Sequence, residues 1–352
     1  MRLLFVTDTL ASGGAERVIS ILSNSFSSYY DEIEIICLRQ HLVFYEIDPK
    51  VKIIFLEDHA TDWISKLKWL RNYIKKNDIV VAFMLRVYCV VLFSLLGLKR
   101  KIVTSERNDP KAAPFKWKIV RALLLPTTTR HVVQTREIKN YFPKFMHDRI
   151  SIINNPINLK QCGDKEWEPS RISILSVARL DKQKNYPMML AAFLKFHEKY
   201  PEFILNIWGN RPHDEQLAEI EEIIESNNAS DFIKLNGRCN NVAAEYDKAY
   251  MYLLTSNYEG FSNSMMEAVC SGVPVISTKV SGANELIDNM RNGILVDIND
   301  SDQLYNAMVL MAEDIELAKN MSVEGKKARV QFDEAAICGK WAELINDLST
   351  LD

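Results

Sequence analysis

Residues 251–278 read MYLLTSNYEGFSNSMMEAVCSGVPVIST, and this stretch decides the fold class. The apolar runs 251–254 and 273–277 predict two buried strands, and residues 264–270 between them have the spacing of a helix. The loop that follows the first strand therefore leads into a helix, and the helix leads to a second strand. Strands that alternate with helices form parallel sheets that helices cover on both faces. The sequence thus predicts an α/β protein.

The same alternation extends over most of the chain. Further strands are predicted at residues 3–7, 33–37, 51–55, 79–83, 101–104, 131–134 and 150–153, and after residue 170 at 172–177, 204–207 and 232–235. Helical periods occur at residues 15–26, 63–75, 115–125, 187–199, 215–226, 304–312, 317–329 and 335–348. Asn154, Asn155 and Pro156 interrupt the pattern and begin a polar run to Ser170, which predicts a linker. Two α/β domains are expected, with the cleft between them as the ligand site.

Length and charge agree with two domains. The chain has 352 residues, which is long for a single hydrophobic core, and its apolar fraction of 47% is typical of a globular protein. Residues 1–160 hold 25 lysine and arginine residues against 15 acidic ones, whereas the remainder holds 18 against 31. Opposite charges on the two halves predict different partners. A basic half suits phosphorylated lipids, an anionic membrane or nucleic acid.

The cysteines and the apolar runs point to a cytoplasmic protein. The six cysteines are scattered without a C-x-x-C pair, which is typical of a reducing compartment. The first residues do not have the pattern of a secretory signal, because Asp8 comes too early. The longest apolar stretch, residues 87–98, is too short to span a bilayer. We therefore expect a protein that touches a membrane without crossing it.

The segment 259–268 has features of a diphosphate-sugar site. The free N–H groups at the start of the predicted helix suit a diphosphate, and Gly260 allows close approach of the backbone to a ligand. The Glu267 carboxylate suits the two hydroxyls of a ribose. A structural alternative is open at this point: Ser264 and Glu267 also have the spacing of a capping box, and Glu259 could be a solvated acid of the loop.

Residues 259–276 resemble the E-x7-E signature of glycosyltransferase family 4, whose usual form is E-G-F-x5-E-A-x3-G-x-P-V-I. This sequence matches that form throughout. The resemblance implies a retaining enzyme with the glycosyltransferase-B fold, in which two doubly wound Rossmann-like domains face a cleft. Residues 1–160 are then the acceptor-binding domain, with a C-terminal helix at about 335–352 packed back on it, and residues 161–334 are the nucleotide-sugar domain.

The resemblance also implies roles for individual residues. Residues 177–185 resemble the basic loop of the family, so Arg179 and Lys184 are expected to grip the donor diphosphate, whose growing negative charge cations stabilise. Glu259 is expected beside the transferred sugar, and Glu267 on the ribose. Close to these acids, the predicted donor contacts through the backbone are Gly260, Phe261 and Ser262. A mixed-charge turn at 179–184 that is simply solvated is the alternative.

Three further segments are similar to donor-domain elements. Trp208-Gly209-Asn210 resembles the W/G-x-G element at a strand end, although Asn210 replaces the usual second glycine; Gly209 is the predicted contact. Arg238 falls where relatives hold the loop that binds the base. Residues 281–287 resemble the G-G-x-x-E-I-I segment, which is expected to pack the domain.

In the first domain, Gly13 and Gly14 lie between a predicted strand and a helix. Such a turn lets a ligand approach the backbone, and the family resemblance puts Gly13 near the acceptor and Gly14 near the donor phosphate. The G-x-G-x-x-G pattern is absent, so no dinucleotide site is predicted. A plain turn between strand and helix is the alternative.

Residues 105–110, SERNDP, follow another predicted strand. Many family members have a histidine in this region, and this chain has none. The S-E-R-N-x-P form resembles a subgroup that includes bacterial transferases of galactose-type sugars, among them N-acetylgalactosamine. Glu106, Arg107 and Asn108 are therefore candidates for sugar or acceptor contacts. Alternatively, Glu106 and Arg107 form only a local ion pair.

Residues 115–125 mix apolar and basic residues at helical spacing, with Lys116, Lys118 and Arg121 as the cations. Cationic amphipathic helices bind anionic interfaces. The alternative is a core helix with a solvated basic face. Because bacterial family members use lipid-diphosphate-linked acceptors, the resemblance favours peripheral contact with the inner face of the cytoplasmic membrane.

The expected reaction is transfer of a sugar from a UDP-sugar, such as UDP-N-acetylgalactosamine or UDP-galactose, to a glycan or lipid-linked acceptor in bacterial surface polysaccharide synthesis. No cofactor is expected, and no metal, because Arg179 and Lys184 supply positive charge and no D-x-D pair ends a likely donor strand. Two alternatives are a nucleotide-sugar epimerase and a non-enzymatic sugar- or nucleic-acid-binding protein. A nucleic-acid partner is not expected, since no recognised binding motif accompanies the basic residues.

Overall fold

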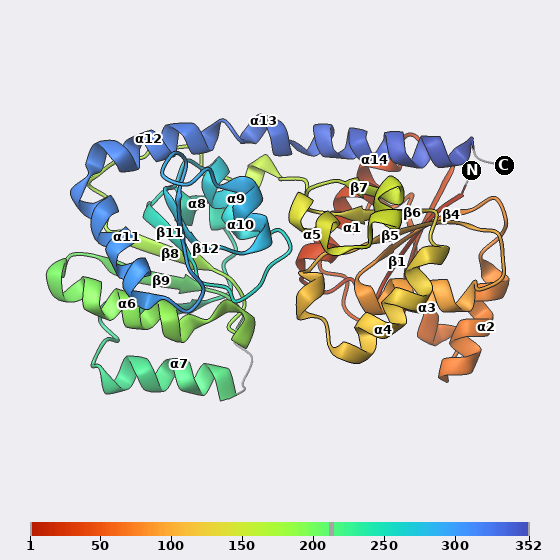
Figure 1. The fold of residues 1–352 in the computed structure, drawn as a ribbon, viewed down its shortest axis with the longest axis horizontal. Helices are drawn as coiled ribbons and strands as arrows, with labels where there is room; N and C mark the ends of the chain where they lie inside the picture. The colour runs from red at the N-terminus through yellow and green to blue at the C-terminus, as the bar shows by residue number, and fades with distance from the viewer. Residues whose placement is uncertain (1, 211–214, 351–352) are drawn as a thin grey trace. The chain divides into compact units, whose positions relative to one another are not determined.

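The computed structural model describes residues 2–210 and 215–350. It divides into two compact units, and Figure 1 shows in each of them a sheet with helices packed against it. Unit 1 comprises Met1–Pro156 and Glu334–Asp352, and unit 2 comprises Ile157–Asp333. The predicted linker at residues 154–170 therefore begins at the first boundary between the units, and the chain returns to unit 1 for its last helix.

Unit 1 is built on a parallel sheet of seven strands in the order β3-β2-β1-β4-β5-β6-β7. The strands are β1 (Arg2–Thr7), β2 (Glu32–Cys37), β3 (Lys52–Phe55), β4 (Ile79–Phe83), β5 (Lys101–Ser105), β6 (Arg130–Val133) and β7 (Ile150–Ile152). The helices are α1 (Gly14–Phe26), α2 (Trp63–Tyr73), α3 (Leu85–Ser94), α4 (Phe115–Leu124), α5 (Arg136–Tyr141) and α14 (Glu334–Ser349). The central strands are continuously apolar because both faces of the sheet are covered.

Helices α1 and α14 share one face of this sheet, and the opposite face forms a separate core with α3. On α14, Ile337, Trp341 and Ile345 are fully buried, and the Trp341 ring stacks on Phe83 of β4 at 5.8 Å between ring centroids. The last helix of the chain is thus part of the core of unit 1.

Unit 2 has a parallel sheet of six strands in the order β10-β9-β8-β11-β12-β13. The strands are β8 (Ser173–Val177), β9 (Ile204–Trp208), β10 (Ile233–Gly237), β11 (Ala249–Leu254), β12 (Val275–Thr278) and β13 (Ile294–Val296). The helices are α6 (Tyr186–Lys199), α7 (Glu215–Ser226), α8 (Val242–Tyr246), α9 (Asn263–Cys270), α10 (Ser281–Leu286), α11 (Ser301–Glu313), α12 (Ile315–Lys326) and α13 (Arg329–Phe332). In both sheets the strand order reverses beside the first strand, as in doubly wound folds.

Residues 87–98, seen in the sequence only as a long apolar stretch, form most of the buried helix α3 and the turn after it. Among the described residues, no helix is both long and apolar enough to cross a membrane.

Candidate functional site

The candidate donor site lies where β8 and β11, neighbours in the sheet of unit 2, reach their carboxyl ends. The loops that follow them are joined by hydrogen bonds. The Asn257 amide donates to the Gln183 carbonyl at 2.8 Å, and the Thr255 hydroxyl donates to the Lys184 carbonyl at 2.8 Å. The Gln183 side chain donates in turn to the Tyr258 carbonyl at 2.9 Å. The two loops therefore form one rigid wall at the sheet edge where ligands of open α/β sheets bind.

Lys184 and Glu259 form an ion pair across these loops. Their side chains are only 12% and 10% exposed, so solvent screens the pair less than it screens a surface ion pair. The Ser256 hydroxyl donates to Glu259 Oε1 at 3.0 Å, the same oxygen that accepts from Lys184. Sequence reasoning missed Ser256, which lies three residues before Glu259 in the same loop.

Arg179 stands apart from this pair. Its side chain is 67% exposed and pairs with Asp181 at 3.1 Å within its own loop. The structure therefore brings two of the three predicted catalytic residues, Lys184 and Glu259, into contact, and leaves Arg179 on the surface of unit 2.

Helix α9 begins differently from the capping box considered above. Its N-cap is Ser262, whose hydroxyl accepts from the Met265 amide at 3.4 Å. The Ser264 hydroxyl is instead engaged by Tyr252, which donates to it at 2.8 Å. Since the helix starts at Asn263, Glu267 lies past its first turn and cannot complete a box with Ser264. The capping-box alternative was wrong, because Ser262 takes the extended backbone that an N-cap requires.

Glu267 is buried, and the Tyr246 hydroxyl lies 3.1 Å from its Oε2. The same hydroxyl lies 2.9 Å from the Ser264 carbonyl in the first turn of α9. Burial raises the pKa of Tyr246 well above its usual range, and the nearby Glu267 charge adds to this. Tyr246 therefore remains a neutral donor. Sequence reasoning also missed this residue, because it is 21 positions away from Glu267 in the chain.

The backbone around Gly260 is closely packed. A Cβ atom on Gly282, in the first turn of α10, would lie 2.5 Å from the Gly260 carbonyl oxygen and 2.8 Å from Phe261 Cα. The Phe261 ring packs on Phe332 at 5.4 Å and belongs to the apolar core of unit 2. At Gly260, Phe261 and Ser262, any ligand contact is therefore expected from the backbone or the Ser262 hydroxyl.

Gly209 follows β9 and Arg238 follows β10, and both strands lie on the side of β8 away from β11. A Cβ on Gly209 would lie 1.8 Å from the Ala178 carbonyl oxygen, so only glycine fits between these loops. The Gly209 amide donates to the Gly237 carbonyl at 2.7 Å, and Arg238, directly after Gly237, is exposed. Both residues lie at the carboxyl edge of the same sheet as Lys184.

In unit 1 the Gly13–Gly14 turn precedes α1 without a side-chain cap. Gly13 has extended backbone, and a Cβ there would lie 2.2 Å from Glu16 Oε2, so the Glu16 carboxylate lies against the start of the helix. The Tyr45 hydroxyl donates to the Gly13 carbonyl at 3.0 Å. Gly14 is exposed. The α1 terminus thus carries a carboxylate of its own where a phosphate was expected.

Glu106 and Arg107 do not form the ion pair considered above. Glu106 is buried, and its Oε2 accepts from Tyr88 at 2.8 Å and from Arg121 at 3.2 Å. Burial raises the pKa of Glu106, although Arg121 opposes the shift. Its carboxylate therefore faces the interior of unit 1 and holds α4 to β5, a structural position that differs from the predicted sugar contact.

Arg107 points elsewhere. Its Nη1 donates to Asn155 Oδ1 at 2.8 Å, and its guanidinium lies 4.8 Å over the Phe83 ring. Burial lowers the pKa of Arg107 to about 9. Asn108 is half-buried and accepts from the Asp109 amide at 2.9 Å, within its own loop.

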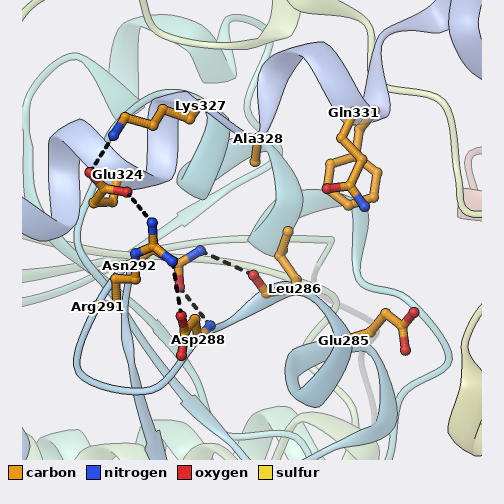
Figure 2. A pocket seen from close by; sticks show the side chains of 10 residues that line it. Glu285, Leu286, Asp288, Arg291, Asn292, Glu324, Lys327, Ala328 and Gln331 are labelled. Atoms are coloured by element: carbon orange, nitrogen blue, oxygen red, sulfur yellow. Dashed lines mark hydrogen bonds and ion pairs between the residues drawn. The ribbon is translucent and has the colours of Figure 1, made fainter.

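A separate cavity of about 240 Å³ lies between α10 and α12 (Figure 2). Its charged groups pair with one another: Arg291 contacts Asp288 at 3.4 Å and Glu324 at 3.1 Å, and Lys327 contacts Glu324. Figure 2 shows this chain of ion pairs along one side. The cavity contains none of the predicted donor residues. Across residues 2–210 and 215–350, no three His, Cys, Asp or Glu side chains are grouped to hold a metal ion.

Two Rossmann-like domains with this strand order define the glycosyltransferase-B fold, and similar solved structures agree. Anabaena HepE, solved in complex with UDP and glucose, matches with a TM-score of 0.83 and 17% identity over 99% of both chains. Sucrose-phosphate synthase from Thermosynechococcus elongatus matches with a TM-score of 0.85 and 17% identity over 99% of this chain and 98% of its own. The predicted fold class is confirmed.

Sequence comparisons point to one family. Residues 162–328 match the model described as glycosyl transferases group 1. A Campylobacter jejuni protein named as a GalNAc-alpha-(1->4)-GalNAc-alpha-(1->3)-diNAcBac-PP-undecaprenol alpha-1,4-N-acetyl-D-galactosaminyltransferase is 28% identical over 99% of both chains. A second transferase of that organism, named for N-acetylgalactosamine-N,N'-diacetylbacillosaminyl-diphospho-undecaprenol, is 28% identical over 94% of this chain and 95% of its own. The second half of the chain therefore resembles group 1 glycosyl transferases, and the relatives that match nearly its whole length support glycosyltransferase activity.

Proposed function

We propose that the protein transfers a sugar, with retention, from a UDP-sugar to a lipid-diphosphate-linked glycan acceptor. The observation that carries the proposal is the ion pair between Lys184 and Glu259, held by Ser256 in the same wall of unit 2 that leads into α9. A cation next to a helix N-terminus suits a diphosphate leaving group. Glu259 then meets the sugar hydroxyls, and Glu267 meets the ribose.

The donor and acceptor classes rest on the relatives. HepE was solved with UDP and with glucose, which supports a UDP-sugar donor. Two relatives that span nearly the whole chain are named as N-acetylgalactosamine transferases acting on undecaprenol diphosphate-linked glycans. We therefore infer an N-acetylgalactosamine or galactose donor and a polyprenyl-diphosphate glycan acceptor for this chain, in the synthesis of a bacterial surface glycan.

The reaction follows from the charges at the site. As the bond between the anomeric carbon and the diphosphate breaks, negative charge grows on the phosphate oxygens, and the Lys184 ammonium stabilises it. The acceptor hydroxyl attacks the same face of the sugar from which the diphosphate leaves, and its proton passes to the departing phosphate. This course retains the anomeric configuration. Lys184 supplies positive charge at the site, so we propose that no metal ion is needed.

The test is the Lys184→Ala variant. Removing the ammonium should lower kcat about 10²- to 10³-fold, the usual effect of losing one group that stabilises transition-state charge. Turnover is measured as UDP release from UDP-N-acetylgalactosamine with a polyprenyl-diphosphate glycan, and circular dichroism checks the fold. Wild-type turnover in a folded variant would rule out the role of Lys184.

We also propose that α4 contacts the cytoplasmic face of the membrane that holds such an acceptor. Phe115, Ile119 and Leu123 are spaced one turn apart and are 78%, 47% and 72% exposed. Lys116 beside them is exposed and Lys118 half-buried. An exposed apolar stripe with flanking cations suits an anionic bilayer surface. Arg121, predicted to share this role, is buried against Glu106 and is not part of the surface.

A further inference from the structure

Two buried tyrosines form hydrogen bonds with the first turn of α9. Tyr246, the last residue of α8, and Tyr252, in β11, are both fully buried and lie 6.3 Å apart between ring centroids. The Tyr252 hydroxyl is 2.8 Å from the Ser264 hydroxyl, and the Tyr246 hydroxyl is 2.9 Å from the Ser264 carbonyl. The Tyr246 hydroxyl also lies 3.1 Å from Glu267 Oε2.

From this geometry we propose that Tyr246 is a positioning residue that fixes the rotamer of Glu267 for the ribose of the nucleotide. The inference rests on the proposed donor site. A carboxylate that accepts both hydroxyls of a cis-diol needs one orientation, and a free glutamate side chain has several rotamers. The single proton of the Tyr246 hydroxyl is shared between one carboxylate oxygen of Glu267 and the Ser264 carbonyl of the same helix. It therefore links the side-chain orientation of Glu267 to the helix that carries it.

The position of Tyr246 in the fold makes it suited to this task. It ends α8, and the connection to α8 starts at the exposed Arg238 loop, where the base is expected. Its ring is packed in the same apolar core as Met265 and Met266 of α9, so it cannot swing away. A single rigid side chain thus ties the segment after β10 to the acid on α9.

The experiment compares Tyr246→Phe with Tyr252→Phe. Each variant removes one hydroxyl from a fully buried tyrosine in the same core: the Tyr246 hydroxyl lies against Glu267, and the Tyr252 hydroxyl donates to Ser264. Dissociation constants for UDP and for 2′-deoxy-UDP are measured by calorimetry on the full chain. Wild type should bind UDP at least several-fold more tightly than 2′-deoxy-UDP, because a hydrogen bond to a charged group is lost with the 2′-hydroxyl.

In Tyr246→Phe we expect UDP affinity to fall about tenfold, the usual effect of losing a hydrogen bond to a charged group, and the preference for UDP over 2′-deoxy-UDP to collapse toward one. Tyr252→Phe should keep the wild-type preference even if both variants lose similar thermal stability. If a folded Tyr246→Phe keeps that preference, the positioning role is wrong. Glu267→Gln separates failure of the Tyr246 role from failure of the Glu267 assignment. If Glu267→Gln also keeps the wild-type preference for UDP, the assignment of Glu267 to the ribose is wrong, and the role of Tyr246 is wrong with it.

Discussion

Lys184 and Glu259 form an ion pair that neutralises both charges. Both side chains are largely buried, and a buried charge without a partner is costly, so loss of either partner would leave the other uncompensated. In the proposed reaction, the donor diphosphate competes with the Glu259 carboxylate for the Lys184 ammonium. Binding of the donor would then release Glu259 toward the sugar.

Glu259→Gln is therefore expected to separate binding from turnover. The neutral amide competes less for Lys184, so UDP should bind about three- to tenfold more tightly, a change of about 1 kcal/mol. Transfer should fall by about two orders of magnitude, because the contact to the sugar is weakened. Calorimetry with UDP and a turnover assay measure the two effects. In a variant that also carries Lys184→Ala the gain in affinity should vanish, and weaker UDP binding by Glu259→Gln itself would contradict the argument.

His131 in β6 gives unit 1 a dependence on pH. The ring is fully buried, stands edge-on to Phe142 at 4.8 Å between centroids, and has Nδ1 2.8 Å from the Thr104 hydroxyl. Burial, with a contribution from the Arg121 charge, lowers the pKa of His131 to about 3. The folded state therefore holds the neutral ring at a pH where the unfolded chain already takes up a proton.

Between pH 6.5, the ordinary pKa of an unfolded histidine, and the folded pKa of about 3, the unfolded state binds a proton that the folded state does not. The stability that the neutral ring contributes is therefore complete above pH 6.5 and is lost as the pH falls. The free energy of unfolding should drop by about 1.4 kcal/mol per pH unit below pH 6 from this group. In His131→Phe, which keeps an aromatic ring in the core, that component should be missing. Urea unfolding at pH 7.5, 6.5, 5.5 and 4.5 measures the slopes; parallel curves for the two proteins would exclude the histidine as the cause.

At the scale of elements, periodicity predicted most strands and long helices within a few residues. Periodicity did not predict elements whose sequence shows no period or is too short to show one. Helix α3 is buried on nearly all sides, so its sequence is apolar throughout and shows no helical stripe. Strand β13 has only three residues and was missed for lack of length. The capping-box alternative at Ser264 was wrong because the N-cap of α9 is Ser262, and residue type does not distinguish the two serines.

The exposed apolar stripe of helix α4 can be tested for contact with a membrane. If its exposed stripe enters a bilayer surface, Phe115→Ser with Leu123→Ser should abolish sedimentation with vesicles of phosphatidylglycerol and phosphatidylethanolamine. Lys116→Glu with Lys118→Glu should weaken sedimentation most at low salt, since the electrostatic attraction is screened.

The control for the α4 experiment is Val330→Ser, an 81% exposed apolar residue of unit 2, which should sediment like wild type. Arg121 is left unchanged in all variants, because reversing its charge would break the buried pair with Glu106 and unfold the helix. If the α4 variants sediment like the control, the stripe does not contact the membrane.

For the whole molecule, the restart of the strand–helix pattern after residue 170 indicated two domains, and the resemblance led us to expect the last helix on the first domain. Contacts between residues that are far apart in the chain could not be predicted from the sequence. Ser256 and Tyr246 carry no motif, and the burial of Arg121, which looked like a surface cation, depends on Glu106 fifteen residues away. Such contacts arise only when strands are ordered side by side in the sheet.

The division of the chain into two units predicts how fragments cut at the boundaries of the units will behave. The Lys184–Glu259 pair and the contact of Tyr246 with Glu267 lie within Ile157–Asp333, so this fragment should fold alone and bind UDP within about threefold of the full chain while showing no transfer. Residues 1–156 alone should aggregate, because they lose Ile337, Trp341 and Ile345 from their core. Joining 334–352 to residue 156 through a Gly/Ser linker should restore a cooperative melt, followed by circular dichroism. A 157–333 fragment that folds without binding UDP would show that unit 1 completes the donor site.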